Sequence, residues 1–145
     1  AGAVNTITLT LSMAVNLQPG TFLSLSGLTG SATAGGDITL GGSMAAFTPG
    51  VALWEPSGGL LTVNVTSDTP LGSPLTLSFN LTNPTVGQPS PSASIEASGA
   101  IVVERREADK GPGNAAPLLV CGFQEASASQ STPSASSINT ITVAF

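Results

Sequence analysis

Apolar and polar residues alternate along much of this chain, and this alternation is the period of a β-strand that buries one face. In the first such stretch, from Ile7 to Met13, apolar side chains recur at every second position between threonines and a serine. Apolar residues at helical spacing are nearly absent. The alternation predicts inward-facing residues in six segments, namely Ile7, Leu9, Leu11 and Met13, then Leu23 and Leu25, then Leu61, Val63 and Val65, then Leu75, Leu77, Phe79 and Leu81, then Ala93, Ile95 and Ala97, and those of the closing TITVAF.

Turn-forming segments separate these alternating stretches. NLQPG, TAGGD, PSGG and NPTVGQPSPS are examples, in which glycine supplies positive φ and proline fixes φ near −65°. Short strands with this punctuation predict an all-β fold, an antiparallel immunoglobulin-like β-sandwich of about seven to nine strands. The chain has no Cys…Trp…Cys pattern, which argues against an antibody-type domain.

Two tracts depart from the alternation and suggest how the chain is divided. Residues 126–137, ASASQSTPSASS, are predicted to form a Ser-rich linker. The linker follows a predicted sandwich domain, residues 1–125, and precedes a terminal strand, residues 138–145, that is able to pair with the next subunit. The tract VERREADKGPGN holds all three cations of the protein. It is interpreted as a solvated loop, with an intersubunit contact as the alternative.

Charge and composition narrow the partners. Charged residues make up 8% of the chain, against about 25% in an average soluble protein, and the net charge is −5. Three cations cannot build a face that neutralises phosphates, so we expect neither nucleic acid nor an anionic membrane surface as a partner. No apolar run approaches the roughly 20 residues of a membrane span, so membrane insertion is not expected either. A hydroxyl-rich surface of this kind is typical of proteins that carry sugar.

Residues for catalysis are scarce. The chain has no His, no Tyr and one Cys, so we predict no catalytic, cofactor or metal site and no enzymatic activity. A pair of carboxylates drawn from Glu55, Asp68, Glu96 and Glu125 is the remaining enzymatic alternative, a glycosidase. Cys121 is predicted to be a buried small apolar residue, with an intermolecular disulfide as the alternative.

Two N-glycosylation motifs lie on the polar faces of predicted strands. Asn64-Val65-Thr66 and Asn80-Leu81-Thr82 fit Asn-X-Ser/Thr, whereas Pro84 excludes Asn83. Both Asn64 and Asn80 have the phase of the outward positions. Ser-Pro and Thr-Pro pairs form turns and are also typical of O-glycosylated stalks. The candidates for O-glycosylation are Thr48-Pro49, Thr69-Pro70, Ser73-Pro74, Ser90-Pro91 and Thr132-Pro133.

The chain begins and ends on nearly the same strand. Asn-Thr-Ile-Thr occurs at residues 5–8 and again at 139–142, and the apolar positions continue in step. Three interpretations follow: a piece of a tandem array, a strand lent to a neighbouring subunit by β-augmentation, or the first and last strands of one sandwich. The second predicts a head-to-tail filament. The predicted assembly residues are Asn5, Ile7, Leu9, Leu11 and Met13 in the first segment and Asn139, Ile141, Val143 and Phe145 in the second.

Most of the chain resembles a repeated extracellular domain of large surface proteins of algae and other protists. The resemblance rests on NTITLTLS, LQPGTFLSLSGLTGS, LLTVNVT, LTLSFNLTNPTVGQPSPSASIEASG and NTITVAF, while VERREADK lies outside it. It implies a secreted β-sandwich, heavy glycosylation and assembly into linear arrays or fibrils.

Together these observations predict a structural protomer of an extracellular glycosylated fibril or cell-surface array. Its expected partners are identical subunits joined head to tail and covalently attached glycans. The alternative is a binding module, an adhesin or an ice-binding β-sandwich, because Thr6, Thr8 and Thr10 form a hydroxyl ladder on one strand.

Overall fold

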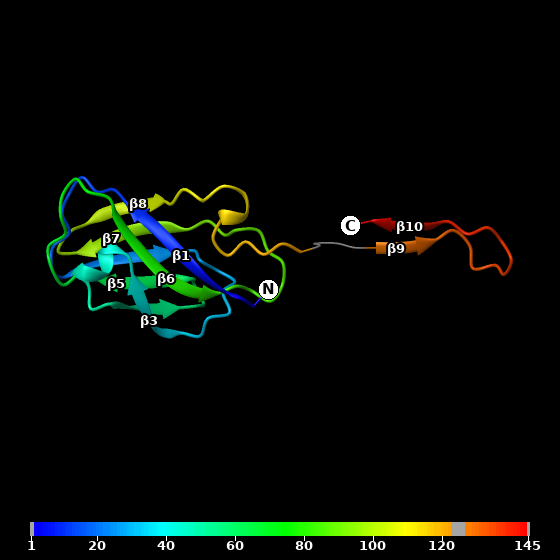
Figure 1. Ribbon diagram of the computed structural model, residues 1–145, viewed down its shortest axis with the longest axis horizontal. Helices are drawn as coiled ribbons and strands as arrows, with labels where there is room; N and C mark the ends of the chain where they lie inside the picture. The colour runs from blue at the N-terminus through cyan, green and yellow to red at the C-terminus, as the bar shows by residue number, and fades with distance from the viewer. Residues whose placement is uncertain (1, 123–126, 145) are drawn as a thin grey trace.

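A computed structural model describes residues 2–122 and 127–144, and this part of the chain contains strands, two short 3-10 helices and no α-helix. Eight strands form one curled antiparallel sheet, and two further strands form a separate hairpin (Figure 1). The predicted all-β, sandwich-like class is therefore confirmed. The strands are β1 Val4–Leu11, β2 Thr21–Ser26, β3 Gly36–Gly41, β4 Val51–Glu55, β5 Leu60–Asn64, β6 Leu75–Thr82, β7 Ser94–Gly99, β8 Val103–Glu107, β9 Ser127–Gln130 and β10 Ile141–Ala144, and the 3-10 helices are Ser43–Phe47 and Gly113–Ala115.

The curled sheet folds over on itself through β3. Its strand order is β1-β6-β3-β4-β5-β2-β7-β8. The first residues of β3 pair with β4, whereas Leu40 and Gly41 at its end pair with β6. The strand β3 thereby joins a smaller layer, made of β1 and β6, to a larger layer, made of β4, β5, β2, β7 and β8. Figure 1 shows β1 and β6 crossing the strands of the larger layer.

Gly42 makes the bend after β3 possible. Its φ is 82°, and a Cβ added there would lie 2.3 Å from the carbonyl oxygen of Thr76 in β6. Only glycine combines this backbone conformation with so close an approach. The next residue fastens the bend, because the Ser43 N–H donates to Thr76 Oγ1 at 3.1 Å and the Thr76 N–H donates to Ser43 Oγ at 2.9 Å.

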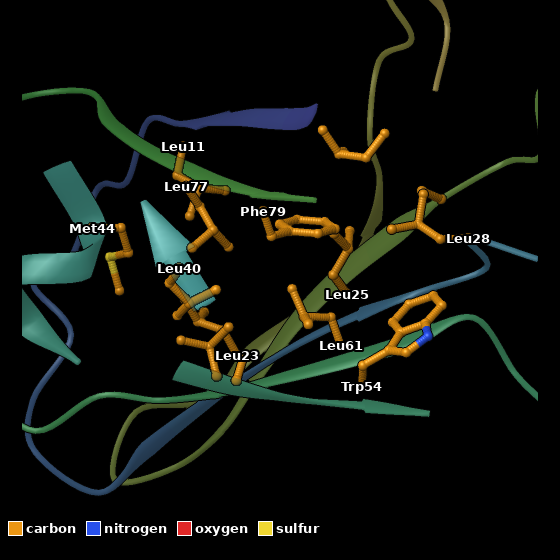
Figure 2. Close-up of a cluster of buried hydrophobic side chains, with 14 of the residues drawn as sticks. Leu11, Leu23, Leu25, Leu28, Leu40, Met44, Trp54, Leu61, Leu77 and Phe79 are labelled. Atoms are coloured by element: carbon orange, nitrogen blue, oxygen red, sulfur yellow. The ribbon is translucent and has the colours of Figure 1, made fainter. Parts of the chain in front are cut away.

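One apolar core fills the space between the layers (Figure 2). Leu77 and Phe79 reach it from β6, and Leu25 and Leu61 reach it from the larger layer. The predicted inward residues of β2, β5 and β6 are buried, and those of β1 and β7 are buried or half-buried. Trp54 of β4 is also buried, and its Nε1–H donates to the carbonyl oxygen of Thr33 at 3.2 Å.

Four strands were not predicted from the alternation. β3 and β4 lie in segments rich in glycine and proline, whose turn signals hid two short strands. The interpretation of VERREADK as a loop is wrong for Val103–Glu107, because this segment is β8. All five side chains of β8 are exposed, so at the edge of the sheet the backbone pairs while the charges stay in water. β9 lies within the tract predicted as a linker, and the boundary predicted at residues 125 and 126 lies outside the described residues.

Replacing Leu61 with Ala should lower the free energy of unfolding by about 2–5 kcal/mol, because the change leaves a cavity between the layers. Leu61 is 0% exposed, whereas Leu53 on the neighbouring strand β4 is 57% exposed. Leu53→Ala is therefore the matched control, with an expected change of about 0.5 kcal/mol or less. Chemical denaturation followed by Trp54 fluorescence measures both, and equal effects would contradict the described core.

Candidate functional site

The curled sheet does not close, and its two edge strands face each other across a gap. β1 lies at one end of the strand order and β8 at the other, and the described residues contain no pairing between them. Three hollows lie along the gap. The middle hollow shares Leu11 and Ile95 with the hollow at one end, and it shares Leu9 and Ala108 with the hollow at the other end. We call this continuous groove, bounded by β1 on one side and by β7, β8 and residues 108–117 on the other, the seam.

The seam is apolar at one end and polar at the other. The apolar hollow lies beside the carboxyl end of β1 and has a volume of about 470 Å³. Met13 and Val15 form one wall, and Ile95 and Val103 form the other. Small-ligand pockets fall in the same range, about 300–1,000 Å³. This hollow, however, continues along the whole of β1 to a polar end beside Asn5. An elongated groove beside an unpaired strand fits an extended chain better than a compact ligand.

The two walls of the seam differ in charge. β1 has no charged residue, no proline and an uninterrupted eight-residue register with β6. Four of the five residues of β8 are charged, and a bulge interrupts its register with β7 between Ile95 and Ala97. Charges and bulges are the devices by which proteins keep further strands off a sheet edge. The β8 edge is thus protected, and the β1 edge is not.

An ion pair fixes β8 at this bulge. The Arg105 guanidinium donates two hydrogen bonds to the Glu96 carboxylate, from Nε at 3.0 Å and from Nη2 at 3.3 Å. The hydrogen bond and the charge of Glu96 raise the pKa of Arg105 above its ordinary value. Both side chains lie in water, where such a pair adds little stability. Its effect is to position the Arg105 guanidinium beside Glu96 of β7.

The second feature is the hairpin of β9 and β10, which lies beyond the end of the curled sheet (Figure 1). Ile141 pairs with Gln130, and Val143 pairs with Ala128. Residues directly opposite in an antiparallel pair share a face, so Ile141, Val143 and Ala128 form one apolar face. Every residue of both strands is exposed, with Ile141 at 62% and Val143 at 56%.

The hairpin loop is closed by Asn139. Its Oδ1 accepts hydrogen bonds from the Ser131 N–H at 3.0 Å, the Ser131 hydroxyl at 3.0 Å and the Thr132 N–H at 3.2 Å, and its Nδ2 donates to Gln130 Oε1 at 3.1 Å. The corresponding Asn5 instead lies in β1 and donates to Asn83 Oδ1 at 3.5 Å. The second Asn-Thr-Ile-Thr thus runs from the hairpin loop into β10, whereas the first lies wholly in the edge strand β1.

The structure keeps the two predicted assembly segments apart. β1 holds Asn5, Ile7, Leu9 and Leu11 and pairs with β6, and Met13 follows its end. β10 holds Ile141 and Val143 and pairs with β9, so it is not a strand of the sandwich. The interpretation of the repeats as first and last strands of one sandwich is therefore wrong. Phe145 lies outside the described residues.

Both predicted N-glycosylation sites lie on outer faces of the sheet. Asn64 at the end of β5 and Asn80 in β6 are exposed, as the alternation predicts. Asn80 Oδ1 accepts the Thr6 hydroxyl at 2.8 Å, which leaves Nδ2, the atom that carries sugar, free of that bond. Asn64 pairs across the sheet with Phe22, an exposed aromatic residue that a sugar could cover.

The candidate O-glycosylation positions differ in accessibility. Thr69 is 3% exposed, and its Oγ1 accepts a hydrogen bond from the Leu17 N–H at 2.8 Å, so the folded chain buries this hydroxyl. Ser73 is exposed, whereas Thr48, Ser90 and Thr132 are half-buried. Ser73 is therefore the exposed hydroxyl residue among the five pairs, and Pro49, Pro70, Pro74 and Pro133 are exposed as well.

Cys121 is exposed, and the prediction of a buried thiol is wrong. Val120, which exchanges backbone hydrogen bonds with Gln88, faces inward, and the next residue therefore faces out. Among the candidate carboxylates that the structure describes, Glu55 lies in β4, Glu96 lies in β7 and Asp68 is exposed after the end of β5. Glu96 binds Arg105, Glu55 accepts a hydrogen bond from Ser57, and Glu125 lies outside the described residues. Within residues 2–122 and 127–144, no three His, Cys, Asp or Glu residues could hold a metal ion.

No helix within the described ranges has the length and apolar character needed to cross a membrane. No protein-family model, curated protein or solved structure matches this chain. The inference of function therefore rests on the seam, the hairpin and the outer faces of the sheet.

When the chain is expressed in a eukaryotic secretory pathway, Asn64 and Asn80 should each carry an N-linked glycan and Asn83 should carry none. The reason is that both acceptors are exposed and have no proline after them. Intact mass should therefore fall by one glycan in each of Asn64→Gln and Asn80→Gln and stay unchanged in Asn83→Gln. Recovery of the bare 14.2 kDa polypeptide would contradict this prediction.

Proposed function

We propose that this chain is a structural, non-enzymatic protomer of an extracellular glycosylated fibril or cell-surface array. Its copies join head to tail through their terminal strands. The observation that carries the proposal is the contrast between the two copies of Asn-Thr-Ile-Thr. One lies in an unprotected sheet edge, and the other leads into a projecting strand with an exposed apolar face.

The hairpin supports this proposal because it is incomplete by itself. Two-stranded hairpins are at best marginally stable in water. Here neither strand has a buried side chain, and Ile138 in the connecting loop is 96% exposed. Apolar residues presented in this way are typical of a surface that another molecule covers.

The distribution of glycosylation motifs is compatible with such an assembly. Asn64 and Asn80 lie on the outer faces of the two layers, and neither lines the seam, although Asn80 accepts a hydrogen bond from Thr6 of β1. Sugar at these positions would cover a neutral, hydroxyl-rich surface. Glycans therefore solubilise the outer faces of the sheet.

Head-to-tail joining can occur within one polypeptide or between separate molecules. If the chain is one repeat of a longer polypeptide, residues 139–145 begin the next repeat. If it is a whole protomer, the same residues enter a neighbouring molecule. Both contacts are heterologous, and a heterologous contact that does not close on itself produces a linear array.

An ice-binding or adhesive module is the second candidate, and the outer face of the smaller layer favours it. Thr6, Thr8 and Thr10 of β1 are exposed and lie opposite Asn80, Ser78 and Thr76 of β6. This face has only two strands, and Asn80 interrupts its row of hydroxyl groups. Thermal hysteresis at millimolar protein would favour ice binding over a structural role.

Removing Ile138–Phe145 should give folded monomers that no longer form fibres. The hairpin adds no side chain to the core, so the melting temperature of the sandwich should stay unchanged. Sedimentation velocity and electron microscopy measure assembly. Polymerisation of the truncated protein as readily as the full chain would contradict the role of the terminal strand.

A point-variant pair tests the same strand without changing its length. Ile141→Ser with Val143→Ser removes the apolar face, and Thr140→Ser with Thr142→Ser is the matched control on the polar face. Two buried apolar side chains contribute about 3 kcal/mol together, so the critical concentration for assembly should rise roughly a hundredfold in the first variant only.

A further inference from the structure

We infer that the seam is the acceptor site for the C-terminal hairpin of a second copy of this chain, whose β10 adds to the free edge of β1. This inference rests on the proposed head-to-tail assembly and specifies the two surfaces that join. The smaller layer would then grow from β6 and β1 to include β10 and β9 of the neighbour.

The smaller layer is too narrow to cover the larger one. β1 and β6 cover only part of the larger layer, and the inner side of β7 beyond β1 lies open along the seam. Ile95 is half-buried there, and Val102 and Val103 are 76% and 43% exposed. A strand placed beside β1 would cover these apolar side chains.

The incoming strand has the same alternation of apolar and polar residues as β1. Ile7, Leu9 and Leu11 of β1 pack inward over the core, with threonines on the outer face. Ile141 and Val143 follow the same Asn-Thr-Ile-Thr phase. A strand that continues the smaller layer in this phase places its apolar residues over the seam and its threonines in water.

The hairpin already presents a free strand edge. β10 pairs with β9 along one of its edges, and among the described residues its other edge has no partner. That edge and the edge of β1 both carry unpaired backbone groups, and both strands lack charged residues. Pairing of two such edges is β-augmentation by a preformed strand.

The charges of β8 exclude the other edge of the sheet as the acceptor. β8 presents Glu104, Arg105, Arg106 and Glu107 and carries a bulge, and Arg105 is paired with Glu96. An uncharged strand that docked there would desolvate them without compensation. The charges direct the incoming strand to β1.

Crosslinking between separately tagged full-length chains tests this assignment. The donor carries Thr142→Cys, the acceptor carries Thr6→Cys, Thr8→Cys or Thr10→Cys, and Cys121→Ser is present in both. These threonines lie on the outer face, where substitution leaves the core intact. A short bis-thiosulfonate reagent joins the chains, and only the product bearing both tags is counted.

One acceptor position on β1 should give roughly fivefold more of this product than Arg105→Cys on β8, because adjacent strands lie about 4.8 Å apart. Moving the donor cysteine to Thr140 should shift the maximum along β1 by two residues. A shift towards Thr6 indicates parallel strands, and a shift towards Thr10 indicates antiparallel strands. Either shift supports the inference. Equal yields at β1 and β8, or a maximum at β8, would overturn it and leave the proposed assembly standing.

A second variant separates the two proposals by assembly alone. Leu9→Lys places a charge on the inner side of the β1 edge, where Leu9 is half-buried, and Thr10→Lys places it on the outer face. Leu9→Lys should abolish fibres while the protein stays folded by circular dichroism, and Thr10→Lys should assemble. Fibres in both variants would overturn the assignment of the seam. Absence of fibres from the Cys121→Ser parent would overturn the proposed assembly itself.

Discussion

The structure depends on a mismatch between the widths of its two layers. Leu77 and Phe79 hold the smaller layer against the larger one, and β3, which pairs with both β4 and β6, allows a single sheet to supply both layers. The smaller layer has two full strands, whereas the larger layer has five. An apolar core of this kind cannot be covered completely by the narrower layer, and the seam is the part that stays open.

An open sheet must also manage two edges, and this chain treats them differently. Two of the three cations of the protein, Arg105 and Arg106, lie on β8. The other edge, β1, exposes only uncharged side chains, those of Val4 and of three threonines. Because the two edges differ, the molecule has two unlike surfaces. Linear assembly by heterologous contacts requires such a pair of unlike surfaces.

The predictability of the site differs between its parts. The exposure of Asn64 and Asn80 followed from strand phase, because the alternation of side chains across a strand is local. The burial of Thr69 could not be foreseen in this way, since it depends on a hydrogen bond to Leu17, which is distant in the sequence. The same holds for Cys121, whose exposure depends on the pairing of Val120 with Gln88.

By itself, the sequence determined which side chains of β1, β2, β5, β6 and β7 face the core, because the period of two requires only neighbouring residues. It also revealed that the chain begins and ends on related strands. Only the tertiary structure decided that the first of these strands forms a sheet edge and that the second forms one strand of a hairpin. Strand neighbours are set by contacts between distant segments, and the charged tract shows this most clearly. Its composition indicates solvent, but pairing with β7 makes it the protected edge of the sheet.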